Sequence, residues 1–381
     1  MKKLLILLSA LILCSCGSTP VDNGGNNKPN DEPEEEIVDL TPSITNENMI
    51  HYLGRHEVKN DSVYFAFSGT GFEIKVNVKE NTNKVLGFMS SIATQYGPTQ
   101  YAYVYVDGVE PSEKLQIAGA LQSYELTVNL PLGEHIIRFV KLDEAFTSIT
   151  LNDLDFVGCE WVRFDKKYEK KIGFYGDSIT CGYGTDGSTP DAFALNTENF
   201  GHTYAYTCAS ALDYDYTVVA QSGLSICMNS WGSEIYFKDI YKTIDYTDPY
   251  NHKNDPVDIA VIALGTNDNT KFSTYSADEQ KEKVELIYQG YVEIVEMMKE
   301  VNPETQFFFV YDLMLFQNGL ITTAIKGTTI YLNNKYGDGT AYMLEFTPDH
   351  AGSGAHPGAQ ASMEDGRILA EFIQNPYEED F

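Results

Sequence analysis

The fold of the second half of the chain is decided by the stretch Ile172-Gly173-Phe174-Tyr175-Gly176-Asp177-Ser178-Ile179-Thr180. Its first four residues form a continuous apolar run with no polar face, and small residues follow at once. Three later runs have the same character, and they cover residues 216–220, 259–264 and 307–311. Strands buried on both faces are typical of a parallel sheet with helices on either side.

Helical stretches separate these apolar runs. The spacing predicts helices over 202–212, 277–299 and 361–373, and the second of them has its apolar residues arranged in one stripe. Strand and helix alternate, so we expect an α/β domain over 170–377. In such sheets the chemistry gathers outside the carboxyl ends of the strands.

The region 40–165 has a different period. Apolar residues alternate with polar ones over 72–78, which indicates a strand with one wet face. Turn formers such as Asp107-Gly108 separate similar runs at 63–67, 101–106, 124–130, 135–140 and 149–151. No helix of useful length fits here, and many short strands predict an antiparallel β-sandwich of the jelly-roll type. Structural support is its expected role, with polysaccharide binding as the alternative.

The N-terminus predicts export. A basic start and an apolar run too short to remain in a bilayer indicate a signal peptide over 1–16. Leu13-Cys14-Ser15-Cys16 resembles the lipobox of bacterial lipoproteins, which implies lipid attachment at Cys16, although an ordinary signal peptide is the alternative. Residues 17–39 are Asn/Gly-rich and then acidic, so they predict a flexible tether. We therefore expect a protein lipid-anchored to the bacterial cell envelope, at the outer membrane or cell surface.

Charge and cysteine content exclude other classes. The chain has 26 Lys plus Arg against 55 Asp plus Glu, so its formal charge is -29, a field that repels nucleic acids and anionic membrane surfaces. Four cysteines lie beyond the leader, and they are Cys159, Cys181, Cys208 and Cys227. Disulfides between these cysteines are an alternative in an exported chain. No close spacing indicates pairing or a zinc site, so buried thiols are the favoured interpretation.

Four motifs lie where chemistry is expected. Ser178 follows the first strand of the parallel sheet, and small neighbours leave its hydroxyl and its N–H free to act. Gly223 follows the second strand, Asn267 follows the third, and His356 stands in Gly354-Ala355-His356-Pro357-Gly358 ahead of the last helix. Taken singly, each has an ordinary interpretation as a turn, a helix cap or a loop histidine.

Together and in this order, the motifs resemble those of the SGNH (GDSL-like) hydrolase superfamily. The resemblance covers roughly 171–374 and implies a flavodoxin-like domain. It implies that Ser178 is the nucleophile and His356 the base, and that the Ser178 N–H, the Gly223 N–H and the Asn267 amide form the oxyanion hole. Asp177 is expected to support the serine loop. No metal and no cofactor are implied.

A β-sandwich ahead of such a domain is similar to the architecture of carbohydrate esterase family 2, bacterial deacetylases of acetyl xylan esterase type. Gly54-Arg55, the Asp107-Gly108 turn and the segment 133–141 resemble its N-terminal domain. Ser353 departs from the superfamily, because an Asp is usual three residues before the histidine. We therefore expect a Ser-His dyad, with a loop carbonyl or Ser353 as the neutral acceptor for His356 Nδ1–H. Asp349 and His350 are not expected to take part.

The predicted function is a serine esterase that removes O-acetyl groups from a plant-type polysaccharide or its oligosaccharides through an acyl-enzyme. A lipase or thioesterase is one alternative, but the segments between the motifs are richer in Tyr, Asn and Asp, with Trp231, than in apolar runs. A non-catalytic carbohydrate-binding lipoprotein is the other. Trp231 and Tyr183 are candidates for stacking on sugar rings. The membrane is expected as a partner only through the lipid anchor, and the sequence leaves the oligomeric state open.

Overall fold

A computed structural model describes residues 38–92, 97, 99–228 and 234–376. The predicted signal peptide, Cys16, nearly all of the predicted tether and Trp231 lie outside these residues. The described chain from Asp39 onward forms one compact unit. None of its helices is both long enough and apolar enough to cross a membrane.

The first part of this unit is a β-sandwich, as the alternation predicted. One sheet has the order β1, β4, β9, β6, β7, with β11 beside β4, and the other has the order β2, β3, β10, β5, β8. All of the paired strands run antiparallel. Their bounds are β1 Ile50–Leu53, β2 Glu57–Lys59, β3 Ser62–Phe65, β4 Gly71–Val78, β5 Lys84–Ser91, β6 Thr99–Val106, β7 Leu115–Ala118, β8 Gln122–Val128, β9 Gly133–Lys141, β10 Ile149–Val157 and β11 Cys159–Val162.

Sequence reasoning missed five of these strands, β1, β2, β5, β7 and β11, and it ended β10 too early. The reason for β10 is a register shift between Leu151 and Asp153, where the alternation of apolar and polar residues changes phase. Inside the sandwich, the Phe72 and Phe139 rings stack with centroids 5.1 Å apart, and Phe65 meets Phe139 edge-on. These fully buried rings form the centre of its core.

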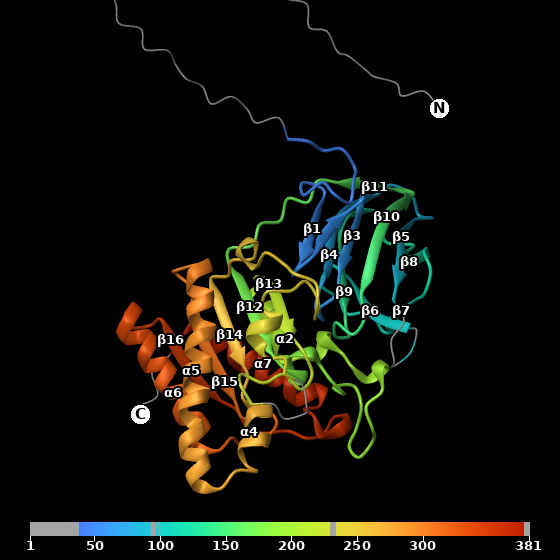
Figure 1. Cartoon of the computed structure of the whole chain (residues 1–381). Coiled ribbons are helices and arrows are strands. Elements are labelled where there is room, and N and C mark those ends of the chain that lie inside the picture. The colour runs from blue at the N-terminus through green and yellow to red at the C-terminus, as the bar shows by residue number, and fades with distance from the viewer. Residues whose placement is uncertain (1–37, 93–96, 98, 229–233, 377–381) are drawn as a thin grey trace, which may run out of the picture. The chain divides into compact units, whose positions relative to one another are not determined.

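The second part is the α/β domain, whose five parallel strands have the order β13, β12, β14, β15, β16. This is the flavodoxin-like order 2-1-3-4-5. Helices α2 and α7 pack on one face, and α3, α5 and α6 pack on the other (Figure 1). The bounds are β12 Lys171–Gly176, α1 Ser178–Cys181, α2 Tyr204–Leu212, β13 Asp215–Ala220, α3 Phe237–Ile240, β14 Ile259–Ala263, α4 Thr266–Phe272, α5 Ala277–Val301, β15 Gln306–Tyr311, α6 Gly319–Tyr336, β16 Ala341–Glu345 and α7 Ala359–Gln374.

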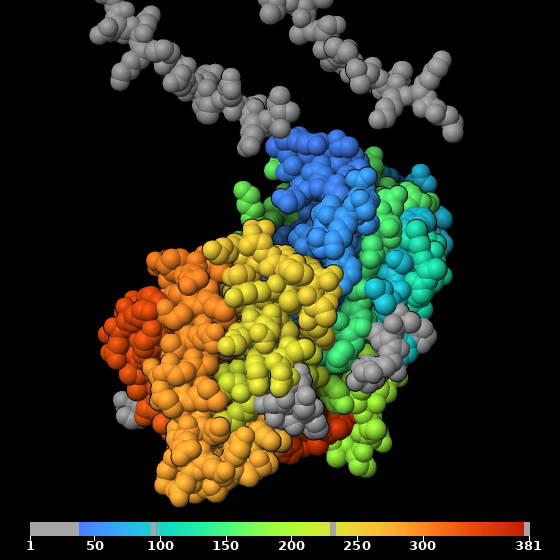
Figure 2. Space-filling model, in the orientation of Figure 1, coloured from blue at the N-terminus to red at the C-terminus, as the bar shows by residue number. Residues whose placement is uncertain are grey.

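The predicted fold class is confirmed in both parts, but the short helices α1, α3 and α4, the long helix α6 and the strand β16 were not predicted. Helix α6 is rich in Thr, Ile and Gly, which have low helix propensity, so its local sequence does not predict a helix. It forms because its Ile321 and Ile325 side chains are buried in the core on the α5 side of the sheet. Helix α5, the long orange helix of Figure 1, lies beside it and reaches the surface seen in Figure 2.

Buried polar contacts join the sandwich to the α/β domain. The Arg55 guanidinium pairs with Asp255 at 3.1 Å and donates to the Tyr241 and Thr243 carbonyls, and both charged side chains are almost fully buried. The Tyr216 hydroxyl donates to the Gly69 carbonyl at 2.7 Å. The Gly54-Arg55 segment is therefore an anchor between the two parts.

Candidate active site

Ser178 is placed by the sharp turn between β12 and α1. Asp177 is the N-cap of α1, and its carboxylate accepts a hydrogen bond from the Ile179 N–H at 3.1 Å. Only glycine fits at position 176, because a Cβ there would lie 2.0 Å from Thr180 Oγ1. The turn leaves Ser178 at the carboxyl end of the sheet, lining a cavity.

His356 reaches Ser178 from the loop before α7. Its Nε2 lies 2.8 Å from Ser178 Oγ, and its Nδ1 lies 3.2 Å from the Gly354 carbonyl oxygen. The carbonyl favours the tautomer with the proton on Nδ1, which leaves Nε2 free to accept the serine proton. Burial lowers the pKa of His356, although the bond to Gly354 acts in the opposite direction, so the imidazole is neutral at neutral pH. The ring of Tyr183 lies 4.4 Å from that of His356.

The other polar side chains of this loop do not act as the acceptor for His356 Nδ1. Asp349 Oδ2 accepts from the N–H groups of Ala351 and Gly358, at 3.0 and 2.8 Å, and so braces the loop. Ser353 is fully buried, and its hydroxyl has no hydrogen-bond partner in the described part of the chain. His350 is exposed, and its carbonyl accepts from the Thr189 hydroxyl. The acceptor on His356 Nδ1 is thus a backbone carbonyl.

The two further residues predicted for the oxyanion hole also line the cavity. Gly223 has a φ of 80°, a conformation that favours glycine. Asn267 Nδ2 donates to the Leu224 carbonyl at 3.0 Å and to Asp177 Oδ2 at 3.1 Å. Burial raises the pKa of Asp177 to about 7, while its hydrogen bonds from Ile179 and Asn267 oppose that rise. The structure therefore brings all four motifs to one place.

The cavity itself has a volume of about 520 Å³. Apolar side chains and polar groups share its wall, and they include Phe146, Tyr183, Gln221, Ile235, Thr270, Met314 and Leu315. Phe146 belongs to the loop between β9 and β10 of the sandwich, so both parts of the compact unit contribute to the wall.

Sequence reasoning missed two buried carboxylates beside this cavity. Asp268 accepts from the N–H groups of Ile226, Cys227 and Met228 at 2.8 to 3.0 Å. Its position directly after Asn267 is the one signal in the sequence that could have marked it as part of the site. Glu144 comes from the sandwich and binds Ser222, 78 residues away in sequence. No local pattern marks it.

One group in the described part of the chain could be considered for a metal ion. Atoms of Glu144, Cys181 and Glu198, all fully buried, lie within 4.8 Å of one another. The Glu144 oxygens already accept hydrogen bonds from Ser222 and Tyr246, and burial holds the pKa of the Cys181 thiol well above its usual range. A protonated thiol is a poor metal ligand. This cluster therefore suits a protonated thiol better than a bound metal ion. The four described cysteines are all free thiols.

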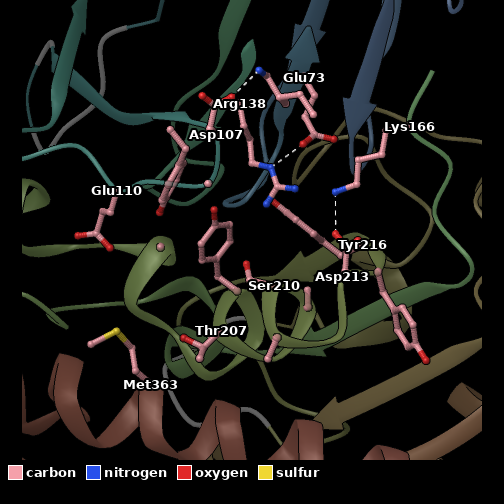
Figure 3. A pocket seen from close by; sticks show the side chains of 18 of the residues that line it. Glu73, Asp107, Glu110, Arg138, Lys166, Thr207, Ser210, Asp213, Tyr216 and Met363 are labelled. Atoms are coloured by element: carbon pink, nitrogen blue, oxygen red, sulfur yellow. Dashed lines mark hydrogen bonds and ion pairs between the residues drawn. The ribbon is translucent and has the colours of Figure 1, made fainter. Parts of the chain in front are cut away.

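A second cavity, of about 840 Å³, lies between the first sheet of the sandwich and α2 (Figure 3). Its charged side chains bind one another: Arg138 pairs with Glu73 at 2.8 Å and Lys166 with Asp213 at 2.7 Å. Thr207 and Ser210 of α2 face this cavity, but the residues that line it include no histidine that could act as their base. Of these two cavities, the one at Ser178 is therefore equipped for nucleophilic chemistry.

Comparison with known families gives the class of the protein. Residues 174–344 match the GDSL-like Lipase/Acylhydrolase family, and residues 52–159 match the Carbohydrate esterase 2 N-terminal domain. The two matches liken the α/β part to the SGNH (GDSL-like) hydrolases and the sandwich to the N-terminal domain of carbohydrate esterase family 2.

Individual proteins are similar over most of the chain. Cellulase/esterase CelE of Acetivibrio thermocellus is 27% identical over 345 residues, which are 87% of this chain and 39% of that protein. An acetylxylan esterase / glucomannan deacetylase of Cellvibrio japonicus is 28% identical over 261 residues, 64% of this chain and 69% of that protein. The structure of a family two carbohydrate esterase from Clostridium thermocellum in complex with cellohexaose has a TM-score of 0.75 at 24% identity, covering 86% of this chain and 98% of that one. The chain spans about two fifths of CelE and about two thirds of the deacetylase.

Proposed function

We propose that this protein is a serine esterase that removes O-acetyl groups from a plant-type polysaccharide or its oligosaccharides. The observation that carries the proposal is the Ser178 Oγ to His356 Nε2 distance of 2.8 Å, with His356 Nδ1 directed at a carbonyl oxygen. A serine and a neutral, oriented imidazole at this distance form a nucleophile and its base.

In the first half-reaction His356 Nε2 takes the Ser178 proton as Oγ attacks the acetyl carbonyl carbon. The carbonyl π electrons move to oxygen, and the Ser178 and Gly223 N–H groups stabilise that oxyanion, joined by Asn267 when one of its Nδ2 hydrogens turns from Asp177 Oδ2 to the cavity. When the carbonyl re-forms, the bond to the sugar oxygen breaks. His356 then gives its proton to that oxygen, the deacetylated sugar leaves, and Ser178 is acetylated.

In the second half-reaction His356 takes a proton from water, and the hydroxide formed attacks the acetyl-serine. Collapse of this second tetrahedral species breaks the bond to Ser178 Oγ, which recovers its proton from His356, and acetate leaves. Throughout, the Gly354 carbonyl holds the imidazole, and it also stabilises the transient imidazolium as a dipole. A dyad of this kind needs no buried carboxylate next to the histidine.

The substrate class is supported by the cavity and by the relatives. The wall combines aromatic and apolar side chains with Gln221 and Thr270, the mixture expected around a sugar ring bearing a small acyl group. The relatives described above include an acetylxylan esterase / glucomannan deacetylase and an esterase bound to cellohexaose. A β-linked plant polysaccharide is therefore the proposed carrier of the acetyl group.

The test is hydrolysis of p-nitrophenyl acetate, butyrate and octanoate, together with acetate release from acetylated xylan and glucomannan. We expect the acetate ester to be preferred, acetate to be released from at least one polymer, and Ser178→Ala to abolish both activities. Preference for octanoate would indicate a lipase or thioesterase. Glycan binding with no hydrolysis of any ester would indicate a carbohydrate-binding lipoprotein instead.

We also propose that the protein is exported and held at the cell envelope by a lipid on Cys16. The basic, apolar and small-residue succession of residues 1–16 supports this. Expression of the full chain with labelled palmitate should label the wild type and leave Cys16→Ala unlabelled. Equal labelling of the two would overturn the proposal.

A further inference from the structure

Glu144 is a fully buried carboxylate in the loop between β9 and β10, and it binds the α/β domain. Its Oε2 accepts from the Ser222 N–H at 2.8 Å and from the Tyr246 hydroxyl at 2.7 Å. Its Oε1 accepts from the Ser222 hydroxyl at 2.6 Å. A buried carboxylate is costly unless it is hydrogen-bonded, and these three bonds, with a weaker one from the Cys181 thiol to Oε2 at 3.8 Å, account for its presence here.

The groups around Glu144 favour its charged form against the cost of burial. Burial raises the pKa of its carboxyl, and the hydrogen bonds from Ser222 and Tyr246 and the charge of Lys141 act against that rise. Glu198, also fully buried, has no hydrogen-bond partner of ordinary geometry at either oxygen among the residues that the structure describes, and burial and the Glu144 charge hold its pKa well above its usual range. Of the two carboxyl groups, Glu144 is therefore the one that accepts hydrogen bonds.

The segment that Glu144 holds is part of the candidate active site. Ser222 stands directly before Gly223, whose φ of 80° sets the direction of the chain at the cavity. On the far side of Gly223 the segment is held by the α/β domain itself, through Asn267 on the Leu224 carbonyl and Asp268 on the N–H groups of 226–228. On the near side, the bonds to the Ser222 N–H and hydroxyl come from Glu144 of the sandwich.

We propose that Glu144 is a positioning residue that directs the Gly223 N–H into the oxyanion hole, so that the β-sandwich is a working part of the esterase. This rests on the proposed function. The bond to the Ser222 N–H fixes the Gln221–Ser222 peptide plane, and the bond to the Ser222 hydroxyl fixes the Ser222 side chain, so together they set the direction in which the Ser222–Gly223 peptide unit leaves Ser222. Without these two bonds, Ser222 can turn and carry the Ser222–Gly223 peptide unit with it, and the Gly223 N–H no longer meets the oxyanion. The effect falls on the transition state rather than on substrate binding.

The experiment compares three variants on p-nitrophenyl acetate. Glu144→Ala should lower kcat by about 10- to 100-fold with KM within about threefold, the range expected when an oxyanion donor is misplaced. Glu144→Gln should recover most of the loss, because its amide oxygen can accept from the Ser222 N–H while its NH₂ group donates to the Ser222 hydroxyl. Glu198→Ala is the matched control: it removes a side chain of the same size from the same cluster without a bond to Ser222, and its kcat should stay within about threefold.

Equal losses in Glu144→Ala and Glu198→Ala would show a packing effect and overturn the proposal, as would a kcat within threefold in Glu144→Ala. Hydrogen exchange of the segment 220–226 decides the same point without any activity. Exchange there should be faster in Glu144→Ala than in the wild type and unchanged in Glu198→Ala, and unchanged exchange in both overturns the proposal. If the folded wild type hydrolyses no ester, the proposed function fails, while the exchange result still decides whether Glu144 holds the segment.

Discussion

Replacement of Asp349 tests how His356 is held. The carboxylate is the acidic side chain that a Ser-His-Asp triad would use on this loop, yet in the structure it accepts from the Ala351 and Gly358 N–H groups rather than from the imidazole. Asp349→Asn keeps an oxygen acceptor for both bonds. Asp349→Ala removes it.

The magnitudes follow from these two bonds. A hydrogen bond to a charged group contributes about 1.5–3 kcal/mol, and the lower end applies because Asp349 is only half-buried, so Asp349→Ala should cost about 3 kcal/mol. At about 2 °C per kcal/mol for a unit of this size, that is a fall of about 6 °C in Tm. The loop remains tied through Ser353 and Gly352, so kcat/KM should fall no more than about tenfold. Asp349→Asn should stay within about threefold of the wild type in kcat/KM.

The assay is p-nitrophenyl acetate hydrolysis with thermal unfolding of the same samples. His350→Ala is the control, since its exposed ring makes no hydrogen bond in the described part of the chain, and it should change neither quantity. Neutralising a triad carboxylate costs about 10⁴-fold in kcat. A loss of that size in Asp349→Asn would refute the dyad with a carbonyl acceptor.

Further outcomes are expected elsewhere in the molecule. Asn267→Ala should lower kcat by about 10²-fold or more, because it removes an amide that holds the Leu224 carbonyl beside Gly223 and that can turn one hydrogen from Asp177 to the oxyanion; a rise in KM alone would make it a substrate-positioning residue. Because burial lowers the pKa of His356 and the base must be neutral, kcat/KM should fall with decreasing pH at a midpoint below about 6.5, and a midpoint above that value contradicts the assignment. Arg55→Ala should cost about 3–5 kcal/mol in denaturant unfolding, since it leaves Asp255 buried with fewer partners, whereas a loss under 1 kcal/mol would show that the anchor contributes little. EDTA should leave activity unchanged, and loss restored by a divalent ion would point to metal chemistry.

Much of the fold follows from local sequence. Strands β12, β13, β14 and β15 are short apolar runs, and α5 has a regular apolar stripe with the Ser276–Glu279 capping box, so each is marked within its own residues. The order of strand-end motifs placed Ser178, Gly223, Asn267 and His356 at one edge of the sheet, because parallel strands point their carboxyl ends the same way. Elements without such a local pattern were not predicted. Helix α6, with its Thr and Gly residues, is an example.

The sequence by itself therefore determined the two-part architecture and the four residues that meet at the cavity. Only the tertiary structure decided what holds them. Whether His356 Nδ1 faces Gly354, Ser353 or Asp349 depends on how one loop closes, and all three stand within a few residues of it. The contact of Glu144 with Ser222 joins segments 78 residues apart in different parts of the unit. Such contacts are set by the packing of whole elements against one another, and no pattern along the chain records them.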